Sequence, residues 1–284
     1  MLPVHDANRP APHRWNGGFE WSASPRIGGG LAPERVDRFD EQGFLLVERA
    51  FDPAVVARAI REIDPFEQRV EEFLRTRPDG RLFIARAGAI TFSTHLVARS
   101  RFLRELSAAP VILSLCLDLV GPDVRLYWDQ AVYKKPGAFQ EFPFHQDNGY
   151  TYVEPQQYLT CWVALTDTDE RNGCPWVIPG WHRFGTLAHE ETPLGWRCVE
   201  SSAEAVPVPA RAGDIVVFSS LTPHRTGPNQ SDAVRKSYIL QYAPDGARAR
   251  SDDPRRSGRQ DDPERQYAVL RGGEPAPLPD GPGA

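Results

Sequence analysis

Between residues 124 and 242 the chain consists largely of short apolar runs, each bounded by glycine, proline or other turn-forming residues. Runs of this length, rich in Val, Ile, Leu, Tyr and Trp, predict β-strands. They cover residues 124–128, 144–147, 158–165, 176–179, 214–218 and 235–242. Their spacing favours an antiparallel sandwich or barrel over a parallel sheet.

The part of the chain before residue 124 has apolar residues at helical spacing instead. We predict helices over residues 34–42, from Pro53 onward and from Pro110 to a stop at Gly121, with a strand over residues 44–47. Helices first and strands afterwards predict an α+β fold that is mainly β. In this fold the N-terminal helices buttress a double-sheet jelly roll.

The chain divides into three parts by composition. Residues 1–30 are rich in Gly, Pro and Trp without a sustained period, which predicts an arm lying on the domain. Residues 31–244 form the single predicted domain. Residues 245–284 are dense in Arg, Asp, Pro and Gly, with one apolar island at 267–270, and predict a surface wrap with a disordered end.

Composition excludes several classes of function. The 284 residues carry a formal net charge of -5 and no basic block, which argues against nucleic acid as a partner. No apolar run approaches the roughly 18 residues of a membrane span, and the N-terminus lacks a secretory pattern. We therefore expect no membrane partner and a cytoplasmic protein. The four cysteines show no C-x-x-C spacing and predict buried thiols.

Two residues in the run 144–147 have the spacing of metal ligands. His145 and Asp147 lie two apart, so a strand would turn both side chains to one face. A third candidate is His224, which follows the apolar run 214–218. Two imidazoles and one carboxylate form a facial triad that leaves three cis positions open, which suits non-haem Fe(II) and O₂.

Zinc is the chemical alternative, because two histidines and a carboxylate with an open position also describe hydrolytic zinc enzymes. Those enzymes usually carry a general base on a helix, and the chain contains no H-E-x-x-H motif. We expect none of the other histidines to bind the metal.

Arg235 strengthens the iron interpretation. It follows His224 by 11 positions and begins the run 235–242, so a neighbouring antiparallel strand would aim its guanidinium into the same cavity. Arginine binds a carboxylate through two parallel hydrogen bonds. 2-Oxoglutarate would chelate Fe(II) through its 1-carboxylate and 2-keto oxygens while Arg235 holds its 5-carboxylate, and Thr226 would add a hydroxyl donor.

The chain resembles the phytanoyl-CoA dioxygenase (PhyH-like) family of Fe(II)- and 2-oxoglutarate-dependent oxygenases. The resemblance extends from Phe39 to Tyr242, and its motifs follow the family order. They are Trp-Asp-Gln-Ala-Val-Tyr-Lys-Lys-Pro-Gly (128–137), Phe-His-Gln-Asp-Asn (144–148), Thr-Cys-Trp-Val-Ala-Leu-Thr-Asp (160–167), Asn-Gly-Cys-Pro-Trp-Val-Ile-Pro-Gly (172–180), Ala-Gly-Asp-Ile-Val-Val-Phe (212–218), then His224, Asn229 and Arg235.

The resemblance implies a double-stranded β-helix, cupin-like fold. It also implies that the iron ligands and catalytic residues are His145, Asp147 and His224. Arg235, Thr226, Gln130 and Trp162 would contact 2-oxoglutarate. We predict substrate contacts from Tyr150, Trp181 and Phe144; Trp181 occupies a position where the family commonly has Ser.

The family reaction consumes O₂ and 2-oxoglutarate, releases succinate and CO₂, and oxidises an unactivated C–H bond. An intact Asp147 excludes the related halogenases, in which a small residue replaces the carboxylate. Hydroxylation is the default prediction, although desaturation, ring closure and epimerisation share the same chemistry. We expect a small-molecule substrate from secondary-metabolite biosynthesis, with residues 183–198 and 83–95 as candidate lids.

Three alternatives stay open. An acyl-CoA 2-hydroxylase fits the family, but no cluster of cations for the CoA phosphates is obvious. A zinc hydrolase would need neither Arg235 nor 2-oxoglutarate. A non-catalytic jelly-roll binding protein would usually have lost a ligand or the arginine. The sequence leaves the oligomeric state undetermined.

Overall fold

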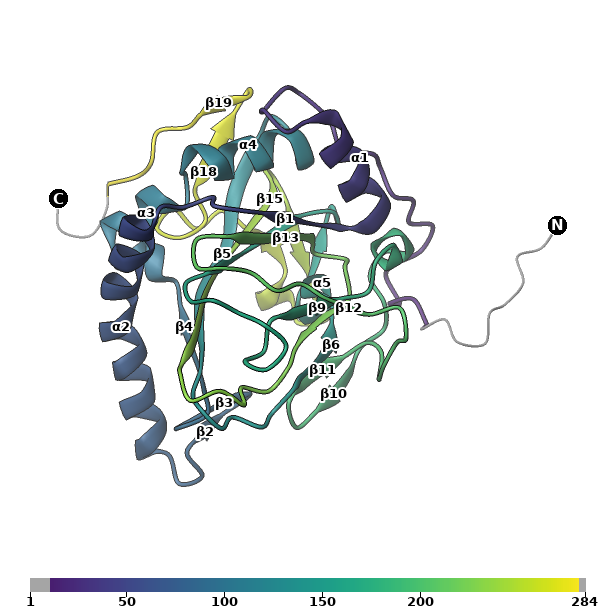
Figure 1. Cartoon of the computed structure of the whole chain (residues 1–284). Coiled ribbons are helices and arrows are strands. Elements are labelled where there is room, and N and C mark those ends of the chain that lie inside the picture. Colours follow the sequence, from purple (N-terminus) through teal and green to yellow (C-terminus); the bar gives the residue numbers. More distant parts are fainter. Residues whose placement is uncertain (1–10, 281–284) are drawn as a thin grey trace.

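The computed structural model describes residues 11–280, and two β-sheets form its centre (Figure 1). The first ten residues of the predicted arm and the last four of the predicted tail lie outside the described residues. Every strand pair in the two sheets is antiparallel, which confirms the predicted jelly roll. The larger sheet has the path β1 (Phe44–Val47), β13 (Ile215–Ser219), β8 (Leu159–Ala164), β15 (Arg235–Pro244), β5 (Val124–Lys134), β4 (Ile90–Thr94), β3 (Ala85–Arg86) and β2 (Arg81–Leu82).

A smaller sheet packs against one face of the larger one. Its order is β12 (Val206–Pro207), β9 (Pro175–Val177), β14 (His224–Thr226) and β6 (Phe142–His145). Val177 of β9 belongs to the same buried cluster as Trp162 and Val216 of the larger sheet, so the two sheets share an apolar interior.

The opposite face of the larger sheet carries the helices, as the sequence predicts. In Figure 1 α2 runs along the left edge beside β4, and α4 lies at the top. α2 continues through Pro65, and the residues Val56, Ile63 and Leu74, which lie on one helical face on either side of this proline, are buried. The helices are α1 (Pro33–Gln42), α2 (Pro53–Thr76), α3 (Arg101–Leu106), α4 (Pro110–Leu119) and α5 (Asp147–Tyr150), with 3-10 turns at Leu96–Ala98, Trp181–Phe184 and Pro254–Arg256.

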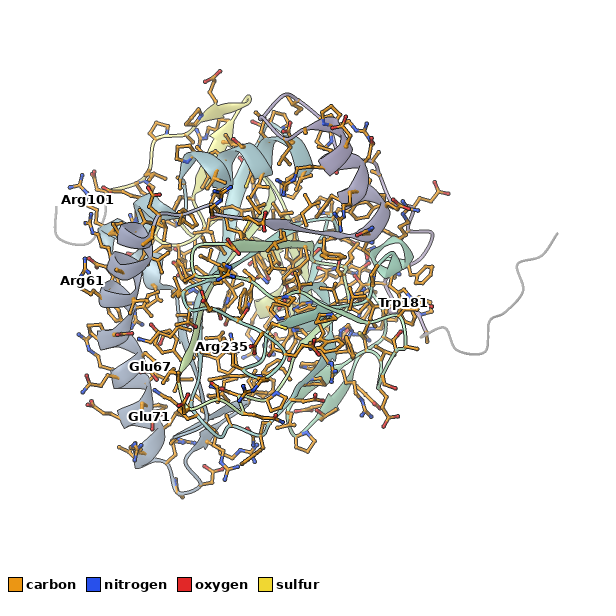
Figure 2. The ribbon with its side chains drawn as sticks, in the orientation of Figure 1. Arg61, Glu67, Glu71, Arg101, Trp181 and Arg235 are labelled. Atoms are coloured by element: carbon orange, nitrogen blue, oxygen red, sulfur yellow. The ribbon has the colours of Figure 1, made fainter. Side chains whose placement is uncertain are left out.

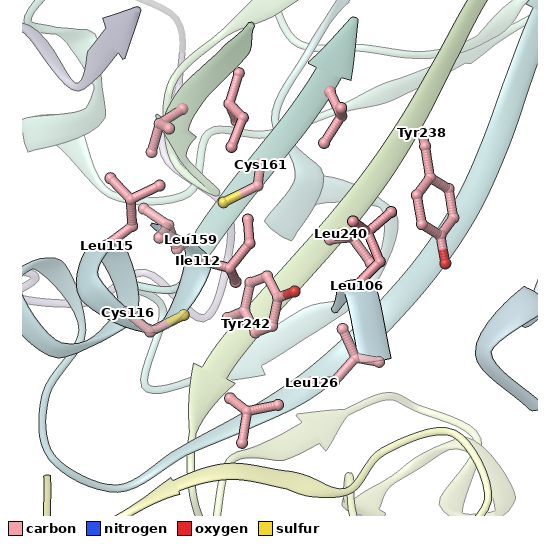
Figure 3. Close-up of a cluster of buried hydrophobic side chains, with 14 of the residues drawn as sticks. Leu106, Ile112, Leu115, Cys116, Leu126, Leu159, Cys161, Tyr238, Leu240 and Tyr242 are labelled. Carbon is pink, nitrogen blue, oxygen red and sulfur yellow. The ribbon is translucent and has the colours of Figure 1, made fainter. Parts of the chain in front are cut away.

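Alternation along each central strand divides the apolar residues between two cores. On β13, Ile215 and Val217 face the helices, whereas Val216 and Phe218 face the smaller sheet. Figure 3 shows part of the helix-side core, where Cys116 of α4 lies near Tyr242 of β15. Burial on both faces explains why these strands are continuous apolar runs in the sequence. All four cysteines are buried and free.

The remaining strands form small additions to the two sheets. β10 (Glu190–Thr192) and β11 (Gly195–Arg197) form a hairpin. A third sheet joins β17 (Gly258–Arg259), β16 (Arg248–Arg250) and β7 (Tyr152–Glu154). Within residues 11–280, no helix combines the length and apolar character that a membrane crossing requires.

The arm is fastened to the domain by two buried carboxylates. Asp40 accepts hydrogen bonds from the backbone and hydroxyl of Ser24. Asp118 accepts from the backbone N–H groups of Gly28, Gly29 and Leu31. These bonds satisfy the donors of a segment that has no regular structure of its own.

The tail differs from the prediction of a surface wrap. Its apolar island forms β18 (Ala268–Arg271), which pairs with β5 and with β19 (Glu274–Pro275). Val269 and Leu270 are buried in the helix-side core. Arg104, also buried, donates hydrogen bonds to carbonyls of residues 97, 264, 279 and 280. The tail therefore completes the core, and the boundaries at residues 30 and 244 stay predictions.

Asp129 makes stability depend on pH. Its side chain is fully buried. Oδ2 accepts hydrogen bonds from the N–H groups of Leu96 and Val97 and from the Tyr238 hydroxyl, and Oδ1 has no partner within residues 11–280. Burial raises the pKa of Asp129 to about 6. Between the unfolded value near 4 and this value, the folded chain retains a proton that the unfolded chain loses. This site therefore loses about 2–3 kcal/mol of stability as pH rises from 4 to 7.

We expect Asp129→Asn to remove that dependence. The free energy of unfolding of the wild type minus that of the variant should fall by about 2–3 kcal/mol between pH 4 and pH 7. Urea unfolding at several pH values measures this difference. A difference that stays constant with pH would contradict the assignment.

Candidate metal and co-substrate site

The three predicted metal ligands converge inside the sandwich. One ligand atom each from His145, Asp147 and His224 lies within 4.8 Å of the others. His145 and His224 are register partners across β6 and β14, with ring centroids 4.2 Å apart. His224 Nε2 lies 3.8 Å from Asp147 Oδ1. Two imidazoles and one carboxylate at this separation fit a transition-metal ion such as Fe(II).

Asp147 reaches this position through a turn rather than through strand alternation. β6 ends at His145, and Asp147 is the first residue of α5. The prediction that both ligands lie within one strand is therefore wrong in its geometry. The backbone of Gln146 is still extended, and its fully buried side chain is bonded to Gly185, Leu187 and Leu221, which anchors the turn that begins at Asp147.

Two further residues hold the same turn. Asn148 donates to Thr186 Oγ1 and accepts from the backbone of Val153. His189 accepts a hydrogen bond from the backbone N–H of Gln146, so this histidine supports the ligand turn. Sequence reasoning missed Gln146, Asn148 and His189. The only local signal was that an amide residue follows each of the two ligands in His-Gln-Asp-Asn.

Both histidine ligands present the same nitrogen to the interior. His145 Nδ1 donates to Pro143 O at 2.9 Å, and His224 Nδ1 donates to Thr222 O at 3.0 Å. Carbonyls only accept, so Nδ1 carries the proton and Nε2 keeps its lone pair. Burial lowers the pKa of His145 to about 3 and that of His224 to about 4. Both imidazoles are neutral, as metal ligation requires.

A hydroxyl orients the carboxylate ligand. Thr160 Oγ1 donates to Asp147 Oδ2 at 2.5 Å, while Oδ1 faces His224. Burial raises the pKa of Asp147, and the hydrogen bond from Thr160 opposes this effect. Sequence reasoning missed Thr160, which lies on β8 and meets Asp147 only in the folded chain.

Arg235 is buried in the same interior, and part of its guanidinium is unpaired. Its side chain lies near the centre of the molecule in Figure 2 and is 1% exposed. Nη1 donates to Ser237 Oγ at 2.7 Å, whereas Nε and Nη2 have no hydrogen-bond partner among residues 11–280. Burial lowers the pKa of Arg235 to about 10, so it remains charged at neutral pH. The Nε and Nη2 edge is the one that binds a carboxylate through two bonds.

The other predicted co-substrate contacts lie around this interior. The centre of the Trp162 ring lies 5.4 Å from the Arg235 guanidinium carbon. Gln130 is in the same cross-strand row as Trp162, with Ile239 between them, and is half-buried. Thr226 lies two residues after His224 on β14 and is also half-buried.

The three predicted substrate contacts have different surroundings. The Tyr150 ring lies 5.2 Å from that of His145. Phe144 lies on the opposite face of β6 from His145, with the Arg225 guanidinium 5.1 Å from its ring. Trp181 donates to Glu204 and lies at the right edge of the molecule in Figure 2, far from Arg235. The structure brings only Tyr150 to the metal ligands, since strand alternation turns Phe144 away.

Parts of both candidate lids are held in place by strand pairing or hydrogen bonds, so only the remaining parts could move as a lid. Residues 90–94 form β4 of the large sheet, and residues 185–187 are bonded to Gln146. The β10–β11 hairpin follows residues 185–187 in the chain. The backbone N–H of Trp196 on this hairpin donates to the Tyr150 hydroxyl.

Thr160→Val tests the orientation of the carboxylate ligand. The variant keeps the side-chain shape but removes the donor to Asp147, so we expect affinity for Fe(II) to fall by about 10- to 100-fold. Anaerobic competition with a chelator measures this change, and circular dichroism checks the fold. Thr168→Val is the matched control, because the buried Thr168 hydroxyl has no partner. Unchanged metal affinity in Thr160→Val would contradict the assignment.

Comparisons with solved structures agree with this architecture. The carbocyclase SnoK from nogalamycin biosynthesis has a TM-score of 0.69 at 23% identity, covering 89% of this chain and 100% of its own. The epimerase SnoN, solved with Fe3+, alpha ketoglutarate and nogalamycin RO, has a TM-score of 0.63 at 24% identity, covering 77% of this chain and 85% of its own.

Sequence comparisons reach the same group of proteins. Phytanoyl-CoA dioxygenase domain-containing protein 1 of Danio rerio is 26% identical over 261 residues, which cover 74% of this chain and 89% of that protein. Ectoine dioxygenase of Bordetella parapertussis is 27% identical over 239 residues, 75% of each chain. The family model described as phytanoyl-CoA dioxygenase (PhyH) matches residues 39–237. The chain therefore belongs to the phytanoyl-CoA dioxygenase (PhyH) family and is an oxidoreductase of the dioxygenase class.

Proposed function

We propose that the protein is an Fe(II)- and 2-oxoglutarate-dependent dioxygenase that hydroxylates an unactivated C–H bond of a small molecule. The observation that carries this proposal is the unpaired Nε and Nη2 edge of Arg235, buried in the interior that holds the triad. A buried guanidinium edge without a partner is costly unless an anion binds it. A zinc hydrolase has no use for such an edge.

Each residue of the site then has a defined task. His145, Asp147 and His224 hold the metal from one side, which leaves coordination positions for 2-oxoglutarate and O₂. Arg235 binds the 5-carboxylate, and Ser237 fixes its orientation through Nη1. The bound metal and co-substrate supply the oxidising power, with release of succinate and CO₂.

A row of cross-strand partners indicates where the substrate approaches. The row crosses the larger sheet from β13 to β4, and its side chains are buried at the β13 end and half-buried at the β4 end. In this order its members are Val216, Trp162, Ile239, Gln130 and Thr94. We infer that a substrate reaches the metal from the side of β4 and β6. Phe92, Phe142 and Tyr150 are half-exposed on this side. Their rings would pack against an organic substrate and exclude water from the metal.

Two hairpins border this side of the site. Arg81 Nη2 on the β2–β3 hairpin donates to Pro193 O on the β10–β11 hairpin at 3.4 Å. The β10–β11 hairpin also contacts the Tyr150 hydroxyl. We infer that these two hairpins determine which substrate binds, since they connect the turn that carries Asp147 and Tyr150 to the protein surface.

Similar folds carry several reaction outcomes. SnoK is described as a carbocyclase and SnoN as an epimerase, both from nogalamycin biosynthesis. The likeness supports a small molecule of secondary metabolism as the substrate here. The intact Asp147 excludes halogenation. Among the remaining family reactions we propose hydroxylation, because it is the simplest.

Arg235→Ala tests the function. In anaerobic titrations of the Fe(II) protein, the charge-transfer band should report 2-oxoglutarate binding in the wild type. Loss of two charge-assisted hydrogen bonds, about 3 kcal/mol in total, should weaken binding by about 100-fold or more. Binding of 2-oxopentanoate, which lacks the distal carboxylate, should be unchanged.

Lys236→Ala is the matched control, because Lys236 is the next residue on β15 and pairs with Asp64 on the opposite face. We expect it to bind both oxo acids like the wild type. If the wild type binds Fe(II) but gives no band with 2-oxoglutarate, the zinc-hydrolase or non-catalytic alternative is correct.

A further inference from the structure

A second cation is buried beside Arg235. Lys134 is the register partner of Arg235 across β5 and β15, and each is 1% exposed. Register partners in an antiparallel pair have Cβ atoms roughly 5 Å apart, with both side chains on the same face. The interior of the sandwich therefore contains two basic side chains close together.

No carboxylate in residues 11–280 forms an ion pair with either cation. Glu141 is the carboxylate whose charge raises the pKa of Lys134, but Glu141 is exposed and pairs with Arg225 at 2.7 Å. Burial and the charge of Arg235 lower the pKa of Lys134 well below its ordinary value. Two buried cations without a counter-charge are unfavourable in the isolated fold.

The Lys134 ammonium links the two sheets. Nζ donates to Thr226 O at 3.0 Å and to Gly227 O, both at the end of β14 in the smaller sheet. An ammonium has three donors, so two carbonyls leave one donor for a further acceptor. These bonds fix the strand end that carries Thr226, two residues beyond the metal ligand His224.

We propose that Lys134 is a positioning residue of the 2-oxoglutarate site: it holds Thr226 and Gly227 opposite Arg235 and supplies a second positive charge for the distal carboxylate. The inference rests on the proposed function. An anion between two buried cations provides the counter-charge that the protein itself lacks, and the low dielectric of the interior strengthens the attraction. Selection of a dicarboxylate over other 2-oxo acids then depends on both Arg235 and Lys134 rather than on Arg235 alone.

Two variants separate the charge of Lys134 from its hydrogen bonds. Lys134→Met keeps most of the apolar volume and removes both. Lys134→Gln removes the charge but keeps a donor for the carbonyls of β14. Lys135→Met is the matched control, because Lys135 is the next residue, pairs with Glu67 at 2.6 Å and lies outside the site.

The measurement is the same anaerobic titration with 2-oxoglutarate and 2-oxopentanoate, preceded by Fe(II) binding. We expect both Lys134 variants to raise the Kd of 2-oxoglutarate by about tenfold or more, since each loses a close charge in a medium of low dielectric. The Kd of 2-oxopentanoate and the Fe(II) affinity should change by less than about twofold. Lys135→Met should match the wild type.

Three results would overturn the proposal. If both variants bind 2-oxoglutarate like the wild type, Lys134 adds nothing to co-substrate binding. If both oxo acids weaken equally, Lys134 only maintains the structure. If Lys134→Met fails to fold and Lys134→Gln binds normally, the charge has no role. A wild type that binds 2-oxoglutarate through Arg235 in all these cases would leave the proposed function intact.

Discussion

The antiparallel pairing of β6 and β14 is the constraint on which the site depends. It sets His145 opposite His224, and each imidazole is fixed through its Nδ1 proton by a carbonyl two residues earlier in the chain. The two Nε2 atoms are therefore positioned by backbone geometry alone. The carboxylate is the exception, since a buried turn and the hydroxyl of Thr160 place it. We expect a site held by these hydrogen bonds to keep its shape when the metal is removed.

Burial has different consequences for the two histidine ligands at one end of the interior and for the two basic residues at the other end. At the metal end it keeps both imidazoles neutral, which prepares them as ligands. At the other end it lowers the pKa of both Arg235 and Lys134, and no carboxylate in residues 11–280 forms an ion pair with either side chain. A dianionic co-substrate fits both ends, because one carboxylate can bind the metal and the other can bind the cations.

The parts around the site differ in how firmly they are held. The ligand turn is bonded to residues 185–187, and these residues also pair with the arm through Pro12 and His13. The hairpins β2–β3 and β10–β11 contact each other through few polar bonds. Enzymes of one fold can thus keep a rigid metal centre and vary the hairpins that meet the substrate.

Local patterns in the sequence determined the jelly roll, the helices that cover it, the metal triad and Arg235. Strand alternation, helical spacing and ligand chemistry act over a few residues, and a linear reading can detect them. Only the tertiary structure decided that Asp147 begins a helical turn held by Gln146 and that Thr160 bonds to its carboxylate. It also decided that Lys134 bonds to Thr226 across the sandwich, that Phe144 faces away from His145 and that residues 268–271 join the core sheet. These features depend on hydrogen bonds and burial between segments far apart in the chain, and such contacts leave no periodic signal in the sequence.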